Sequence, residues 1–198
     1  MKADAFALLG LPRQALLATE EVRAAFQRAG AGVHPDGAGD EAERDRLTAE
    51  FAALNEAHAV VSSLPRRLRH LLELEYSETA ALKTGAVMEG AMMELFATTG
   101  AAVQQAAVVQ ARKRTAATAL SRAMLAGDEM QAQEALDAAN RRVDAACEAL
   151  NLELAELDKV RAAGGNVATR LQTCAARAGF LEKWQAQLRA AFAGFFAT

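Results

Sequence analysis

TEEVRAAFQRAGAGVHPDGAGDEAERDRLTAEFAALNEAHAVV, residues 19–61, is the stretch that decides the fold. Its first part predicts a helix from about Thr19, because Thr-Glu-Glu offers an N-cap followed by first-turn carboxylates. Glycines and Pro35 then interrupt the helix. A longer helix should follow from about Asp40 to Val61, since an apolar stripe recurs there at spacings of four and three: Leu47, Phe51, Leu54, His58 and Val61. The sequence therefore predicts two helices joined by a loop that contains His34-Pro35-Asp36.

Two short helices are expected beside this pair. Residues 4–10 predict one of them, with Asp4 near its start and Gly10 near its end. Pro65 should open the other, because proline is favoured at the first helical position. In that helix the leucines are expected to face inward and the arginines to face solvent: Leu68, Leu71 and Leu72 against Arg66, Arg67 and Arg69.

The chain after residue 80 predicts long alanine-rich helices. We expect helices over 82–97, ending near Gly100, over 101–126, over 129–162, and after a break at Gly164-Gly165 with Asn166 as the cap. The last two carry apolar stripes that indicate antiparallel packing around a shared seam. The stripes consist of Val143, Cys147, Leu150, Leu154 and Leu157, and of Val167, Leu171, Cys174, Ala178, Leu181, Gln185, Leu188, Phe192 and Phe195. The predicted fold class is all-α.

Composition excludes several classes of function. A net charge of −3 without a basic block does not favour a nucleic-acid partner. No apolar run reaches the roughly 18 residues that a membrane span needs, and no apolar segment precedes Pro12 as in a signal peptide. We therefore expect a cytoplasmic protein with no membrane contact.

The side chains that usually carry chemistry are poorly placed for it. Cys147 and Cys174 have neither a CxxC spacing nor a nearby histidine, so we expect buried thiols rather than a disulfide framework or a zinc site. His58 and His70 offer no HxxxH or HExxH partner, and no serine or cysteine lies beside a base. The sequence predicts a protein without metal, cofactor or catalytic residues, and therefore not an enzyme.

His34-Pro35-Asp36, set between two such helices with short helices before and after, resembles the J-domain of the Hsp40 co-chaperones. The segments DAFALLGLPRQALLATEEVRAAF and LNEAHAVVSSLPRRLRHLLELE are similar to the HscB family of iron–sulfur-assembly co-chaperones. AVMEGAM and GFLEKWQAQL resemble the first and last helices of the C-terminal bundle of that family. The resemblance implies a four-helix J-domain at 1–76, with an antiparallel hairpin, and an elongated antiparallel bundle at 80–198.

The resemblance also implies partners and contact residues. The J-domain would stimulate ATP hydrolysis by an Hsp70 chaperone of the HscA or DnaK kind, through His34, Pro35, Asp36, Arg23, Gln27 and Arg28. The bundle would bind an IscU-like iron–sulfur scaffold protein through Val87, Met88, Ala91 and Phe180. Core packing is the alternative for these four residues. Phe180 lies about 130° from the apolar seam, and it is therefore either covered by another helix or exposed for binding, with Trp184 extending its face.

Some residues depart from the pattern of the family. Residues 1–75 carry 9 basic and 12 acidic side chains, whereas J-domains usually present a basic face on the second helix. His58 replaces an expected aromatic residue, a change that we interpret as packing rather than as a site. Two other functions therefore stay open: a J-domain protein that serves a different client, and a structural helical interaction protein with a relic J-domain.

Overall fold

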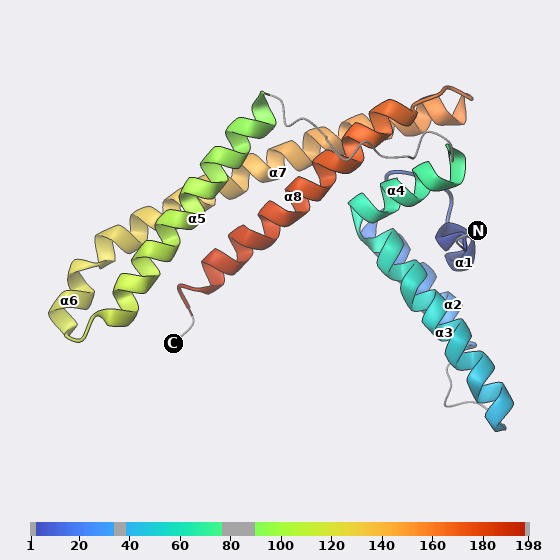
Figure 1. Ribbon diagram of the computed structural model, residues 1–198, viewed down its shortest axis with the longest axis horizontal. Helices are drawn as coiled ribbons and strands as arrows, with labels where there is room; N and C mark the ends of the chain where they lie inside the picture. Colours follow the sequence, from blue (N-terminus) through green and yellow to red (C-terminus); the bar gives the residue numbers. More distant parts are fainter. Residues whose placement is uncertain (1–2, 34–38, 77–89, 197–198) are drawn as a thin grey trace. The chain divides into compact units, whose positions relative to one another are not determined.

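The computed structural model describes residues 3–33, 39–76 and 90–196, in which every regular element is an α-helix (Figure 1). The prediction of an all-α protein is confirmed. The helices are α1 (Ala5–Leu9), α2 (Thr19–Gly30), α3 (Glu41–Ser62), α4 (Leu64–Glu75), α5 (Ala91–Thr115), α6 (Ala119–Met124), α7 (Ala126–Ala162) and α8 (Ala168–Ala193). They divide into two compact units. The first unit is Met1–Thr84 with Asn151–Ala176, and the second unit is Gly85–Leu150 with Arg177–Thr198.

The first helix is defined by its caps, as the sequence predicts. The carboxylate of Asp4 accepts hydrogen bonds from the backbone N–H groups of Phe6 and Ala7, at 2.9 and 3.2 Å. Gly10 ends the helix in the left-handed region, at φ 63° and ψ 34°. Phe6 is fully buried, so this short helix is fixed by both its caps and its core contact.

Helices α2 and α3 pack against each other in the first unit. The ring of Phe26 stacks on that of His58 with centroids 4.4 Å apart, which confirms that His58 is a packing residue. Asp40 caps α3 by accepting from the N–H of Glu43 at 2.8 Å, and the Glu43 carboxylate accepts from the N–H of Gly39 at 2.8 Å. These exchanged bonds fix the start of α3 where the sequence predicts it.

The structure of α4 confirms the prediction for its leucines and contradicts the prediction for Arg67. Its three leucines are buried, but Arg67 is only 6% exposed, so the expectation that it faces solvent is wrong. Its Nε donates to the carbonyl of Val61 at 2.7 Å, and a terminal nitrogen donates to the carbonyl of Ala15 at 3.1 Å. Burial lowers the pKa of Arg67, although nearby Asp158 opposes the change. The guanidinium is buried because it satisfies two backbone carbonyls there.

Two helix ends that the sequence predicts in the second unit, near Gly100 and at Gly127, are wrong. Helix α5 passes through Gly100 without interruption, and Gly127 lies inside the first turn of α7. A glycine in a helix costs about 1 kcal/mol relative to alanine, and the remaining residues of a long helix can offset that amount. The helix instead ends at Thr115, because a capping box formed by Thr118 and Ser121 starts α6.

Helices α7 and α8 run antiparallel in each unit, as predicted. In the first unit Arg170 lies 3.4 Å from Glu153, and in the second Gln185 donates to Asp144 at 3.4 Å. The break between them has Gly164 at φ 81°, and Asn166 accepts from the N–H of Ala168 at 3.0 Å. The predicted seam is buried except for three half-buried side chains: Cys147, Gln185 and Phe192.

The two cysteines differ in burial. Cys174 is buried as predicted, but Cys147 is half-buried, so the prediction is wrong for this thiol. Burial raises the pKa of Cys147, and the negative charge of Asp144 adds to the effect. Among the helices that the structure describes, none combines the length and the apolarity needed to cross a membrane.

Candidate functional site

The candidate Hsp70-binding site lies at the connection between α2 and α3. His34, Pro35 and Asp36 themselves fall outside the described residues, but both ends of their segment are defined. On one side the N–H of Val33 donates to the carbonyl of Gly30 at 3.3 Å. On the other side Asp40 caps α3. The tripeptide therefore belongs to the chain that joins two packed helices, as the sequence predicts.

The remaining predicted Hsp70 contacts lie on α2. Arg23, Gln27 and Arg28 are all exposed, because Val22 and Ala25 fill the buried face of this helix. Arg23 and Gln27 are four residues apart and share one side of the helix. Glu20 and Glu21 in the first turn are exposed as well, so the solvent face of α2 carries balanced rather than basic charge.

His70 joins α4 to the start of α1. It is 6% exposed, and its Nε2 accepts a hydrogen bond from the N–H of Ala5 at 3.0 Å. Its ring stacks on Phe6 with centroids 5.8 Å apart. Because Nε2 is the acceptor, this geometry requires the neutral ring with its proton on Nδ1, which lies 3.9 Å from the Glu73 carboxylate. His70 is thus a structural residue, and sequence reasoning gave no sign of it.

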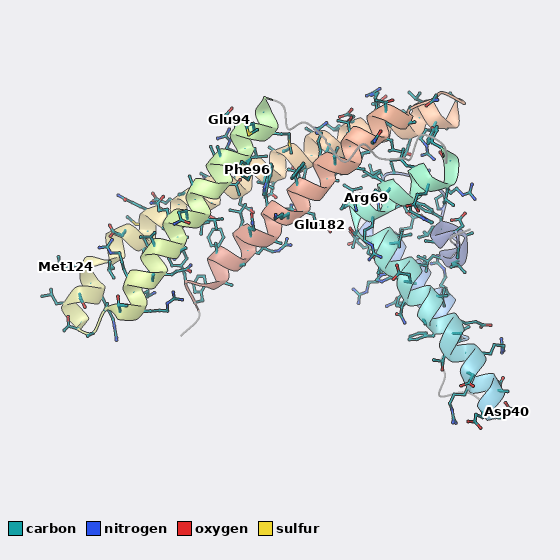
Figure 2. The ribbon with its side chains drawn as sticks, viewed as in Figure 1. Asp40, Arg69, Glu94, Phe96, Met124 and Glu182 are labelled. Atoms are coloured by element: carbon teal, nitrogen blue, oxygen red, sulfur yellow. The ribbon has the colours of Figure 1, made fainter. Side chains whose placement is uncertain are left out.

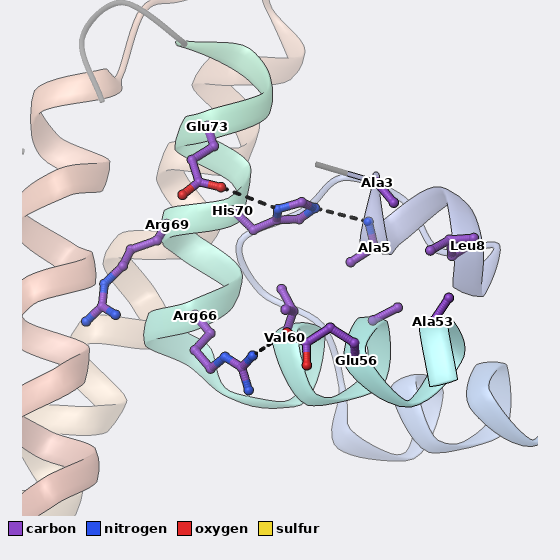
Figure 3. Close-up of a pocket in the computed structure, with 11 residues that line it drawn as sticks. Ala3, Ala5, Leu8, Ala53, Glu56, Val60, Arg66, Arg69, His70 and Glu73 are labelled. Carbon is purple, nitrogen blue, oxygen red and sulfur yellow. Dashed lines mark hydrogen bonds and ion pairs between the residues drawn. The ribbon is translucent and has the colours of Figure 1, made fainter. Parts of the chain in front are cut away.

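A cleft of about 510 Å³ opens beside His70, between α1, α3 and α4 (Figure 3). Its apolar wall includes Leu8, Ala53 and Val60, and Arg66 at its edge pairs with Glu56 at 2.8 Å. The described residues contain no group of three histidine, cysteine or acidic side chains that could hold a metal ion. The cleft therefore combines an apolar wall with charged side chains, since Arg69 and Glu73 line it as well.

A half-buried ion network fixes the loop that follows α1. The two carboxylate oxygens of Asp158 accept from the N–H groups of Ala15 and Leu16, each at 3.0 Å. Arg161 pairs with Asp158 and with Glu75, and its side chain is only 9% exposed. Burial alone would lower the pKa of Arg161, but the two carboxylates outweigh burial and raise it. The signal for this network in the sequence was weak. Asp158 and Arg161 are three residues apart, beside the apolar stripe that ends at Leu157.

The predicted client residues are described in part. Val87 and Met88 lie outside the described residues, while Ala91 is exposed as the first residue of α5. Phe180 is half-buried, so it is neither fully covered nor fully exposed. The structure thus describes Ala91 and Phe180 on different helices of the second unit, and it does not test whether the four residues form one site.

Two aromatic rings lie near Phe180: Trp184, which the sequence prediction included, and Phe96, which it left out. The ring of Phe180 stacks on that of Trp184, with centroids 6.0 Å apart, and Phe96 of α5 lies 6.2 Å from Trp184. Trp184 is 2% exposed, so it does not extend the exposed aromatic face as predicted, whereas Phe96 is 50% exposed (Figure 2). Met93 on the same helix is 49% exposed. Met93 precedes Phe96 by three residues, so the two share one side of a helix. This spacing could have suggested that Met93 and Phe96 form a pair.

A comparison with solved structures finds the chaperone HscB from Vibrio cholerae. The similarity covers 94% of this chain and 99% of that chain, with 20% sequence identity and a TM-score of 0.49. A scan of protein families and a search of curated protein sequences found no match.

Proposed function

We propose that this protein is a J-domain co-chaperone that stimulates ATP hydrolysis by an Hsp70. The observation that carries the proposal is the position of His34-Pro35-Asp36 in the segment between two packed helices, α2 and α3. Arg23, Gln27 and Arg28 on α2 are exposed and would add polar contacts with the Hsp70. The protein itself catalyses nothing in this proposal and acts without a cofactor or metal, in the cytoplasm.

Each residue of the tripeptide has a physical role in the proposed contact. Pro35 fixes its own φ and has no N–H to donate, which restricts the segment. Asp36 can accept a charge-assisted hydrogen bond from an arginine of the Hsp70. His34 can hold neighbouring groups through either ring nitrogen. Because the solvent face of α2 is not basic, electrostatic steering should be weak, and the rate of association should change little with salt.

We further propose that the second unit binds an iron–sulfur scaffold protein as its client, through Val87, Met88, Ala91 and Phe180. The exposed Phe96 and Met93 support an apolar contact close to Phe180, since exposed apolar patches mark interaction sites. A different client is the alternative, and the extended alanine-rich helices of this unit favour it. A relic J-domain on a structural protein is the other alternative, supported by the weakly basic face of α2.

The J-domain is tested by measuring ATP turnover of the cognate Hsp70 with the full-length protein. We expect stimulation by the wild type and its loss with His34→Gln. Arg46→Gln is the matched control, because Arg46 is an exposed side chain of α3 that pairs locally with Glu50. No stimulation by the wild type, or equal stimulation by His34→Gln, would leave the relic J-domain as the better explanation.

The client is tested by titrating the scaffold protein against the wild type and Phe180→Ala. We expect at least a tenfold loss of affinity, since truncation of an aromatic hot-spot residue costs about 2 kcal/mol or more and about 1.4 kcal/mol corresponds to tenfold. Phe196→Ala is the control, because Phe196 is 77% exposed and is not part of the proposed site. If the wild type does not bind the scaffold, the client is a different protein. If Phe180→Ala binds as tightly as the wild type, Phe180 is not in the site.

A further inference from the structure

Three aromatic residues form a cluster across α5 and α8 in the second unit. The ring centroid of Trp184 lies 6.0 Å from that of Phe180 and 6.2 Å from that of Phe96. Trp184 is buried, whereas Phe180 is half-buried and Phe96 of α5 is half exposed (Figure 2). The two phenylalanines thus lie on either side of a tryptophan that is already covered. We call these three residues the aromatic cluster.

The aromatic cluster is suited to receive an apolar side chain. Phe96 rests against a buried ring, so it has little conformational freedom left to lose when a partner binds. Met93 precedes it by three residues, shares its side of α5 and is exposed as well, and a flexible thioether adapts to different partners. Aromatic residues with covered neighbours commonly dominate the energy of an interface.

A cation without a carboxylate partner lies on the same side of α8 as Phe180. Lys183 follows Phe180 by three residues, which places the two about 60° apart around the helix. Its side chain is exposed, and no carboxylate within the described part of the chain pairs with it. The apolar surface of the cluster therefore has a positive charge at its edge on α8.

The neighbouring acidic residues do not balance this charge, because they lie on other faces. Glu94 is two residues from Phe96, about 160° around α5, and it pairs with Arg142 of α7 (Figure 2). Glu182 is likewise two residues from Phe180, about 160° around α8. The face that carries the cluster and Lys183 is thus apolar with one cation.

We propose that the aromatic cluster, together with Lys183, binds a client segment in which an apolar side chain is flanked by carboxylates. The apolar side chain lies between Phe96 and Phe180, and a carboxylate pairs with Lys183, since complementary charge fixes the partner and its register. The inference rests on the proposed client site and adds Phe96 and Lys183 to it. A second copy of this surface is a poor partner, because the two lysines would repel each other.

The test uses the full-length protein and the emission of Trp184, the single tryptophan of the chain. The probe is a peptide of about twelve residues without tryptophan, with leucines four positions apart among glutamates, the spacing at which a helix presents its anchors. We expect the emission of Trp184 to change with this peptide and not with the same peptide carrying lysines in place of glutamates. Added salt should weaken the binding, because Lys183 is exposed.

Matched variants separate the apolar contact from the charge. Phe96→Ala should weaken binding by about tenfold, and Phe96→Leu, which keeps an apolar side chain, by less. Val108→Ala is the control, at a valine of equal exposure about 120° around α5 from Phe96. Lys183→Glu should weaken binding by about fivefold at low salt. Arg189→Glu makes the same change of net charge at an exposed position about 120° around α8 from Lys183, and it should have little effect.

The outcomes distinguish this inference from the proposed function. An unaltered Trp184 emission with the glutamate peptide, equal binding of the two peptides, or unaltered affinity with Phe96→Ala would overturn the inference. If the scaffold protein does not bind while the glutamate peptide binds as expected, the aromatic cluster is a docking site and the client is a different protein. If the scaffold binds wild type and Phe96→Ala equally, the inference is wrong and the proposed client stands. Binding of anionic lipid vesicles in preference to the glutamate peptide would assign the surface to membranes instead.

Discussion

The two units are stabilised by different kinds of contact. In the first unit, polar side chains bond to backbone groups: buried His70 to Ala5, buried Arg67 to Val61 and Ala15, and half-buried Asp158 to Ala15 and Leu16. In the second unit, long helices pack through small apolar residues such as Ala102, Ala106 and Ala132. Helix length accounts for part of the difference. Helices α1, α2 and α4 of the first unit have five to twelve residues and cannot form stably by themselves, whereas α5 of the second unit has 25 residues and can pack along its length.

The largest effect should come from the ion network. Asp158→Ala removes the acceptor of two backbone N–H groups and one partner of the half-buried Arg161, so we expect a loss of about 3 kcal/mol of unfolding free energy. Chemical denaturation measures the loss, and Asp137→Ala, at an exposed residue of α7, is the control. Equal midpoints for the two variants would show that the first unit does not depend on polar anchors.

His70→Ala is expected to have the next largest effect, about 2 kcal/mol. It leaves the N–H of Ala5 without its acceptor and removes the ring that packs on Phe6. Hydrogen exchange should show faster exchange at α1 than in the wild type. The exposed neighbour Arg69 offers the control Arg69→Ala. Unaltered protection of α1 would mean that the Asp4 cap alone fixes this helix.

A smaller effect, about 1 kcal/mol, is expected from the Asp4 cap and should depend on pH. Burial alone would raise the pKa of Asp4, but the hydrogen bonds from Arg13, Ala7 and Phe6 lower it from its ordinary value of 3.8. A lowered pKa in the folded state means that the stabilisation is complete well above pH 3.8 and is lost as the pH falls below that value.

Asp4→Asn separates the cap from its charge, because asparagine caps helices but does not titrate. Thermal unfolding between pH 7 and pH 3 should therefore show a smaller acid-induced fall in Tm for Asp4→Asn than for the wild type. Asp137→Asn, at an exposed position of α7, should behave as the wild type. An identical fall in all three proteins would show that Asp4 is not a source of acid sensitivity.

The smallest effect is an expected gain in the second unit. Thr99 is 1% exposed and its hydroxyl has no hydrogen-bond partner among the residues that the structure describes, so Thr99→Val replaces an unsatisfied polar group by a methyl group of similar shape. We expect the unfolding free energy to rise by up to about 1 kcal/mol. Thr173→Val is the control, since its hydroxyl is exposed and donates to the carbonyl of Thr169. A loss of stability with Thr99→Val would contradict the view that this unit packs through apolar contacts.

What the sequence by itself determined is local. Asp4 and Gly10 set the ends of α1, Asp40 set the start of α3, and Gly164 and Asn166 set the turn before α8, because capping depends on residues within a few positions of the helix end. The apolar stripes gave the buried face of α3, α7 and α8 for the same reason: helical period places those residues on one side.

What only the tertiary structure decided depends on partners far along the chain. Arg67 is buried because carbonyls of Val61 and Ala15 meet its guanidinium, and position 15 lies 52 residues away. Asp158 acquires its role from N–H groups more than 140 residues away. Gly100 stays helical because the rest of α5 offsets its cost. The candidate site follows the same division. Its tripeptide His34-Pro35-Asp36 was evident in the sequence. The exposure of Phe96 and of α6 became evident only in the packed structure, because exposure depends on neighbouring residues rather than on residue type.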